Sequence, residues 1–175
     1  MPHRVIGLFG GTFDPIHLGH LNLALEMLEN TPLDEVWFCP TFHNPLKVGQ
    51  PCVAKPKERL EMVQLAIEGE PRFRCSDWEM NQGKEMYTVD VLRHLVKPPH
   101  AYHLIIGEDL VREFDRWKEP EEIQTLAPLL VGSRSRFEIS STHIRERLQK
   151  RLSCAYLLPH KVLDYISQNH LYFPN

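Results

Sequence analysis

The chain has 175 residues, of which 42% are hydrophobic and 25% are charged, a composition typical of a soluble globular protein. Its formal net charge is −3 and its pI is about 6.4, so we do not expect a broad basic surface for nucleic acid. We recognise no signal peptide, no membrane span and no CxxC pair among the four cysteines, and we therefore expect a cytoplasmic protein whose residues 1–175 form a single domain.

Predicted strands and helices alternate along the chain. The strands are expected at residues 4–9, 35–39, 72–75, 101–106 and 129–131, and the helices at 18–29, 57–68, 88–97 and 141–169. Thr88 is predicted to cap the third of these helices. Alternation of this kind predicts an α/β fold with a Rossmann-like, doubly wound parallel sheet of about five strands and a C-terminal helical segment. Ligands of such sheets bind at the carboxyl ends of the strands.

The sequence GGTFDPIHLGH, residues 10–20, joins the first predicted strand to the first predicted helix. Gly10 and Gly11 allow the backbone to turn tightly and to approach a ligand closely. The start of the following helix offers N–H groups that suit a phosphate. His17 and His20 are three residues apart, so both should face the same spot. A zinc site would need further ligands, which the neighbouring sequence does not supply, and we predict no bound metal here.

This sequence resembles the (H/T)xGH signature of the nucleotidyltransferase α/β-phosphodiesterase superfamily, in the form found in bacterial nicotinate-mononucleotide adenylyltransferases. The resemblance implies that His17 and His20 are catalytic and bind ATP. It also implies ATP contacts from Gly10, Gly11, Thr12 and Phe13.

A second motif, ISSTHIR, spans residues 139–145. Ser140, Ser141 and Thr142 are good residues for the start of a helix, and Arg145 lies one turn further on the face of Ser141. Taken alone, the motif also fits an ordinary capped surface helix. It resembles the ISSTxIR signature of the same superfamily, which implies that these four residues bind ATP and that Arg145 is catalytic.

Two segments between these motifs resemble further parts of the family. IIGEDLVREFDRW, residues 105–117, resembles its IIGxD…W segment, and MYTVDVL, residues 86–92, resembles its SYTxxTL segment. The resemblance implies that Gly107 contacts ATP, and it favours a pyridine nucleotide over phosphopantetheine as the acceptor. The residues implied in acceptor binding are Tyr87, Thr88, Asp109 and Trp117. For Trp117, packing in the core stays an equal alternative.

The implied reaction transfers AMP from ATP, with Mg²⁺, to the phosphate of nicotinate mononucleotide, giving deamido-NAD and pyrophosphate. Lys47 and Arg59 are candidate phosphate contacts, although both also fit solvated surface cations. Only residues 132–138 separate the fifth strand from ISSTHIR, where the family usually inserts a helix and a strand. The alternatives are a nicotinamide-mononucleotide or phosphopantetheine adenylyltransferase, or a nucleotide-binding relative made inactive by this shortened segment. The order of substrate binding and the formation of a homo-oligomer stay open.

Overall fold

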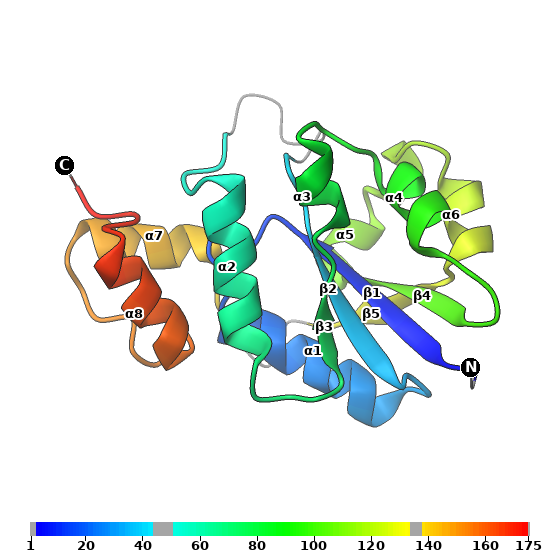
Figure 1. The fold of residues 1–175 in the computed structure, drawn as a ribbon, viewed down its shortest axis with the longest axis horizontal. Coiled ribbons are helices and arrows are strands. Elements are labelled where there is room, and N and C mark those ends of the chain that lie inside the picture. Colours follow the sequence, from blue (N-terminus) through cyan, green and yellow to red (C-terminus); the bar gives the residue numbers. More distant parts are fainter. Residues whose placement is uncertain (1–2, 44–50, 134–137, 175) are drawn as a thin grey trace.

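A computed structural model describes residues 3–43, 51–133 and 138–174. Its sheet has the order β3-β2-β1-β4-β5, and every pair of neighbouring strands is parallel (Figure 1). The strands are β1 Val5–Gly11, β2 Glu35–Pro40, β3 Phe73–Cys75, β4 Ala101–Gly107 and β5 Leu129–Gly132. The chain adds strands in one direction from β1 to β3 and then in the other from β4 to β5, so a switch point lies between β1 and β4. The predicted doubly wound parallel sheet is confirmed.

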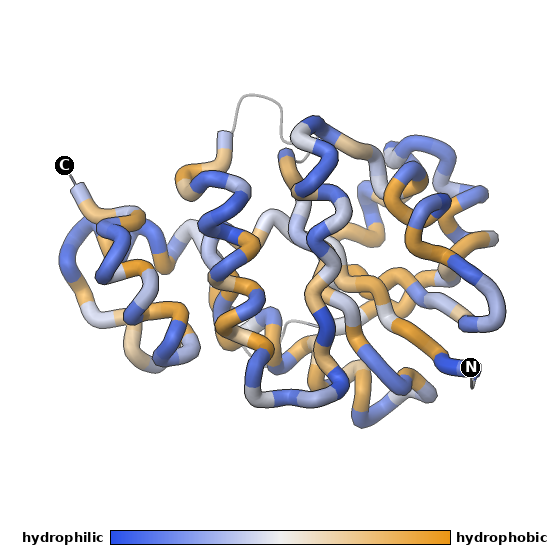
Figure 2. Tube along the Cα trace, viewed as in Figure 1, coloured by the Kyte–Doolittle hydropathy of each residue, from blue (hydrophilic) through white to orange (hydrophobic). Residues whose placement is uncertain are grey.

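The side chains of the central strands alternate between two hydrophobic clusters, one on each face of the sheet. In β4, Leu104 and Ile106 enter one cluster, whereas Ile105 enters the other. In β1, Leu8 and Phe9 divide in the same way. Figure 2 shows the hydrophobic residues along the sheet and hydrophilic residues along the outer turns. Because both faces are apolar, both must be covered by helices.

Each face of the sheet has its own helices (Figure 1). The face of Ile105 is covered by α1 Leu18–Asn30, α2 Pro56–Ile67, α7 Ser141–Gln149 and α8 His160–Gln168. The opposite face is covered by α4 Thr88–Leu95, the 3-10 turn η1 Phe114–Arg116 and α6 Pro120–Leu126. Two short helices, α3 Trp78–Gln82 and α5 Glu108–Val111, lie next to the ends of β3 and β4. No helix of the described ranges is long and apolar enough to cross a membrane.

The structure corrects two local predictions. The predicted helix 141–169 is two helices, because the chain turns after Gln149: Arg151 has a φ of 55°, and the Arg147 guanidinium donates to the Ser153 carbonyl at 2.8 and 3.0 Å. Tyr87, not Thr88, is the N-cap of α4, so Thr88 is the first residue of that helix.

Candidate active site

A cavity of about 480 Å³ opens at the carboxyl ends of β1 and β4, at the switch point of the sheet. Lys47 lies outside the described residues. Apart from Arg59, every other residue predicted to contact a substrate lines this cavity: Gly10, Gly11, Thr12, Phe13, His17, His20, Tyr87, Thr88, Gly107, Asp109, Trp117, Ser140, Ser141, Thr142 and Arg145. The fold therefore brings the four motifs together in one place.

The two histidines lie at the start of α1. His17 is its N-cap and His20 stands in its first turn, and their rings stack with centroids 3.7 Å apart and planes 23° apart. The His17 backbone N–H donates to Nδ1 of His20 at 3.2 Å. Because Nδ1 accepts this bond, the neutral His20 ring carries its proton on Nε2. The predicted common orientation of the pair is confirmed, and the tautomer makes Nε2 of His20 a hydrogen-bond donor.

Close packing fixes both rings. The His20 ring meets the edge of Phe13, with centroids 5.0 Å apart and planes 84° apart, and it also lies near Phe9. A Cβ at Gly19 would come within 3.0 Å of Nδ1 of His17 and within 3.4 Å of Ile139. Glycine at this position therefore lets the His17 ring and Ile139 approach the first turn of α1.

Asp14 anchors the loop that carries the histidines. Its side chain is buried: Oδ2 accepts from the Val53 N–H at 2.8 Å, and Oδ1 accepts from the Ala54 N–H at 3.0 Å and from the Tyr172 hydroxyl at 2.7 Å. From the sequence, Asp14 is only part of an Asp-Pro turn signal. Its partners follow 39, 40 and 158 positions later, so no local pattern predicts them.

The second motif binds directly to the first. Ser140 caps α7, and its Oγ accepts from the His143 N–H at 3.1 Å. The Ser141 hydroxyl donates to the carbonyl of Pro15 at 2.8 Å. Nη1 of Arg145 donates to the carbonyl of Asp14 at 2.7 Å, while Nη2 donates to the Thr142 hydroxyl at 3.3 Å. The start of α7 thus lies against the loop that leads into α1, and both helix starts line the cavity, an arrangement that suits a chain of phosphates.

Arg59 corrects a prediction, because it is neither a phosphate contact nor a surface cation. Its side chain is fully buried and donates to the carbonyls of Thr12 at 2.6 Å, Thr41 at 2.7 Å and Phe42 at 2.7 Å. It joins the loop after β1 to the loop after β2. Sequence reasoning could not distinguish it from an exposed arginine, because both occur in the first turns of amphipathic helices.

Glu79 is a buried carboxyl that the sequence analysis missed. It lines the cavity and accepts from the Phe42 N–H at 2.9 Å. Burial raises the pKa of Glu79 to about 7, although the Phe42 N–H and the nearby Arg59 charge both act to lower it. This carboxyl therefore changes charge near neutral pH.

The opposite side of the cavity presents aromatic side chains. Trp117 is half-buried and packs against Phe114, with ring centroids 5.4 Å apart. It also lines the cavity, so packing in the core and contact with a ligand are compatible for this side chain. Its indole N–H is buried and has no hydrogen-bond partner among the described residues. Nζ of Lys118 lies 4.8 Å above the ring of Tyr87.

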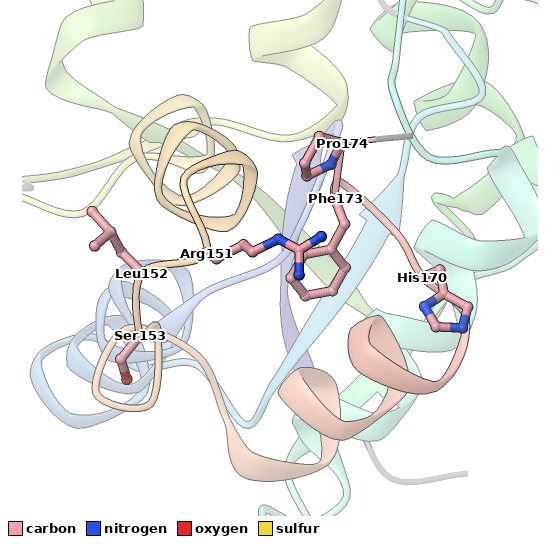
Figure 3. A pocket seen from close by; sticks show the side chains of 6 residues that line it. All are labelled: Arg151, Leu152, Ser153, His170, Phe173 and Pro174. Carbon is pink, nitrogen blue, oxygen red and sulfur yellow. The ribbon is translucent and has the colours of Figure 1, made fainter.

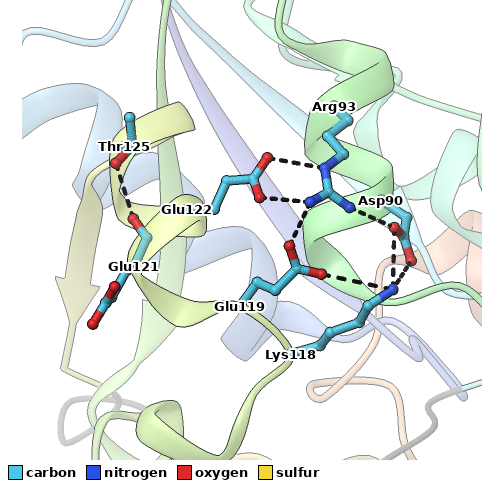
Figure 4. Close-up of polar contacts among 7 residues, drawn as sticks. All are labelled: Asp90, Arg93, Lys118, Glu119, Glu121, Glu122 and Thr125. Atoms are coloured by element: carbon cyan, nitrogen blue, oxygen red, sulfur yellow. Dashed lines mark hydrogen bonds and ion pairs between the residues drawn. The ribbon is translucent and has the colours of Figure 1, made fainter.

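An ion-pair cluster joins α4 to α6, next to these side chains (Figure 4). Arg93 of α4 donates to both carboxylate oxygens of Glu122 in α6, at 2.9 and 2.5 Å, and to Glu119 at 2.5 Å. Asp90 of α4 accepts from Arg93 at 3.1 Å and from Lys118 at 3.2 Å. These exposed bonds contribute little stability individually, and together they connect α4 to α6 and to the segment between Trp117 and α6.

A second hollow lies in the C-terminal part of the chain (Figure 3). It is lined by Arg151, Leu152, Ser153, His170, Phe173 and Pro174, and none of the predicted site residues contributes to it. Among the residues with described positions, no group of three or more His, Cys, Asp or Glu side chains could hold a metal ion.

Comparison with known proteins gives consistent matches. Residues 8–147 match the cytidylyltransferase-like family. The probable nicotinate-nucleotide adenylyltransferase of Oceanobacillus iheyensis is 36% identical over 97% of both chains, and that of Bacteroides fragilis is 42% identical over 93% of this chain and 90% of its own. The structure of a putative nicotinate-nucleotide adenylyltransferase from Vibrio parahaemolyticus matches 97% of this chain and 95% of its own with a TM-score of 0.78 at 23% identity. Plasmodium falciparum nicotinic acid mononucleotide adenylyltransferase complexed with NaAD matches 97% of this chain and 98% of its own with a TM-score of 0.77 at 20% identity.

Proposed function

The chain belongs to the cytidylyltransferase-like family and, within it, to the nicotinate-nucleotide adenylyltransferases, and on this premise we propose that it makes deamido-NAD in NAD biosynthesis. The reaction transfers AMP from ATP to the 5′-phosphate of nicotinate mononucleotide and releases pyrophosphate. The observation that carries the proposal is the stacked His17–His20 pair at a helix start, which lines one cavity at the switch point together with Arg145.

The chemistry needs no nucleophilic side chain. The second pKa of a phosphate monoester is about 6, so the acceptor is mostly a dianion at neutral pH. One of its oxygens attacks the α-phosphorus of ATP in line and forms a new P–O bond. The bond from the α-phosphorus to the bridging oxygen breaks, and pyrophosphate leaves with the electron pair. Catalysis then consists of positioning and charge neutralisation.

The cavity provides donors for each part of this step. His20 Nε2 and His17 are assigned to the α-phosphate oxygens, where charge develops in the transition state. Arg145 and the start of α7 are assigned to the β- and γ-phosphates. Thr12 and the glycines before it offer backbone N–H groups close to the triphosphate.

Magnesium is proposed to enter with ATP as a complex with its phosphates, where it neutralises charge on the leaving pyrophosphate. The donor set fits this route, because the residues facing the phosphate region carry hydroxyls, imidazoles and a guanidinium. Such groups bind phosphate oxygens, whereas a resident Mg²⁺ would require clustered carboxylates, and the carboxyl side chains that line the described part of the cavity form no such cluster.

The test is pyrophosphate release from MgATP with nicotinate mononucleotide, nicotinamide mononucleotide and phosphopantetheine as separate acceptors. We expect release with nicotinate mononucleotide and much less with the other two. A His17→Ala/His20→Ala protein prepared in parallel measures release by contaminants. Preferential turnover of phosphopantetheine would contradict the proposed acceptor, and no turnover with any acceptor would identify an inactive nucleotide-binding relative.

A further inference from the structure

The C-terminal segment holds the histidine loop at four points. Two lie in α7, where Ser141 and Arg145 bond to the carbonyls of Pro15 and Asp14. A third is the Leu18 N–H, which donates to the carbonyl of Leu157 at 3.0 Å. The fourth is the hydroxyl of Tyr172, which comes from the tail after α8 and bonds to the Asp14 carboxylate. The tail therefore reaches the same loop that the second motif reaches, by a separate route.

Tyr172 is placed firmly for this bond. Its side chain is 6% exposed and belongs to the hydrophobic cluster that contains Phe9 and Phe13. Its φ is 66°, a left-handed conformation that an aromatic residue adopts only when its surroundings require it. Burial and the Asp14 charge both raise the pKa of Tyr172, so its hydroxyl keeps its proton and remains a donor at neutral pH.

Asp14 connects Tyr172 to two parts of the site, the loop of His17 and the Arg145 side chain. It lies three residues before His17, and its own carbonyl accepts the bond from Arg145 at 2.7 Å. Its carboxylate also holds the N–H groups of Val53 and Ala54. Without the Tyr172 hydroxyl, one oxygen of a buried carboxylate loses a donor, which favours movement of Asp14 toward other partners. Misplacement of catalytic groups by about 1 Å can lower a rate by about 10².

We propose that Tyr172 is a positioning residue for adenylyl transfer, acting through Asp14 on Arg145. The proposal rests on the proposed function, because Arg145 is assigned there to the leaving phosphates. It predicts that a tail residue outside the two signature motifs changes the kinetics of ATP use.

The direct test is Tyr172→Phe, which removes only the hydroxyl and keeps the buried ring. We expect kcat to fall about 5- to 10-fold and the KM for ATP to rise more than the KM for the acceptor, in protein that is folded by circular dichroism. Tyr165→Phe in α8 is the matched control, because it removes the same group from a half-buried tyrosine of the same cluster without touching Asp14, and it should keep wild-type kinetics. Wild-type kinetics in folded Tyr172→Phe would overturn the proposal.

A double-mutant comparison separates positioning from general loosening. In an Arg145→Ala background, Tyr172→Phe should lower kcat by a clearly smaller factor than it does in the wild type, because the side chain through which it acts is absent. An equal loss in both backgrounds would overturn the proposal. If the wild type is inactive with every acceptor, the proposed function fails, and calorimetric binding of MgATP then tests Tyr172 by itself. A Tyr172→Phe protein that binds MgATP about threefold or more weakly than wild type would support the proposal, and equal affinity would overturn it.

Discussion

Among single residues, His20 has the most completely defined geometry. Its Nδ1 accepts the His17 N–H, and its ring is packed between Phe13 and the ring of His17. We expect His20→Ala to keep the fold and to lower kcat by roughly 10²–10³, the usual loss for one transition-state donor. Steady-state kinetics, with urea unfolding as a control for stability, check this. A folded variant with near-normal kcat would remove His20 from the mechanism.

His17 is expected to behave similarly, because it stacks on His20 at the same helix start. His17→Ala should lower kcat by roughly 10²–10³. Since both rings serve one developing charge, the double variant should cost less in activation free energy than the sum of the single variants. Strict additivity in the measured kcat values would show that the two histidines act on different groups.

Arg145 is assigned to the leaving phosphates, which belong only to ATP. Arg145→Ala should therefore raise the KM for ATP more than the KM for the acceptor. Arg145→Lys keeps the charge but loses the fork with which Arg145 reaches Asp14 and Thr142, so it should restore only part of the ATP affinity. A variant impaired mainly in acceptor binding would contradict the assignment.

These residue roles differ in how far the sequence predicts them. His17, His20 and Arg145 stand in motifs with a characteristic spacing, and the cavity brings them together as expected. Arg59 and Glu79 carry no such signal, because their burial depends on where the loops after β1 and β2 converge. A local sequence pattern does not encode that convergence.

Among the elements, the loops after β1 and β2 depend on one side chain of α2. Arg59→Met keeps much of the volume of Arg59 but leaves three carbonyls without their donor and Glu79 without its neighbouring positive charge. Breaking a buried charged network typically costs about 3–5 kcal/mol. Urea unfolding should show a loss of this size in the free energy of unfolding. Lys57 is an exposed cation in the same turn of α2, and Lys57→Met should lose almost nothing. Equal effects of the two variants would rule out the structural role of Arg59.

The short helix α3 makes stability depend on pH through Glu79. The pKa of its carboxyl is about 7 in the folded protein, against 4.5 for an unperturbed glutamate. Between these pH values the folded protein holds a proton that the unfolded chain has released. The contribution of Glu79 to the free energy of unfolding is therefore full below about pH 4.5 and is lost as pH rises toward 7. The loss is at most about 3 kcal/mol.

Glu79→Gln isolates this effect, because glutamine can still accept from the Phe42 N–H and does not titrate. The free energy of unfolding should be measured for both proteins from pH 5 to pH 8. We expect the wild type to lose stability relative to Glu79→Gln as pH rises. Parallel profiles would mean that the Glu79 pKa is ordinary.

The bounds of the strands and helices are predicted best where an apolar segment ends at a clear turn or helix signal. All five strands lie within two residues of their predicted bounds, and all except β3 are mainly apolar segments next to a turn or helix signal. The break between α7 and α8 was not predicted. Pro159 marks the start of α8, but the end of α7 depends on the contact of Arg147 with Ser153, which no local pattern encodes. The helices α3, α5 and α6 are too short to show a clear period of 3.6 residues.

In the whole molecule, the cavity combines parts that are distant in the sequence. The β1–α1 loop supplies the histidines, the tail and α7 hold that loop, and the α4–α6 side supplies Tyr87 and Trp117. Both hydrophobic clusters share the strands of one sheet, and we propose on this ground that residues 1–175 form a single domain. We propose that the acceptor is selected where these parts meet.

That arrangement predicts a preference for nicotinate over nicotinamide mononucleotide. Tyr87 and Thr88 line the cavity at the start of α4, where backbone N–H groups point out of the helix and suit a carboxylate. Trp117 lines the same side and is assigned to the face of the pyridine ring. An amide would place its NH₂ against those donors, at a cost of about 1–3 kcal/mol. This corresponds to a preference of roughly tenfold or more in kcat/KM for the two mononucleotides under identical conditions.

The N–H of Thr88 offers a sharper test of the same idea. Thr88 is the first residue of α4 and Tyr87 is extended, with φ −83° and ψ 150°, so proline fits at position 88 and removes only the N–H and the hydroxyl. Thr88→Ala removes the hydroxyl but keeps the N–H, and it serves as the matched control. We expect Thr88→Pro to lose most of the preference and Thr88→Ala to keep it. Equal kcat/KM values for the two mononucleotides in the wild type would refute this account of acceptor choice while leaving adenylyl transfer intact. Equal loss of preference in both variants would assign the selection to the hydroxyl instead.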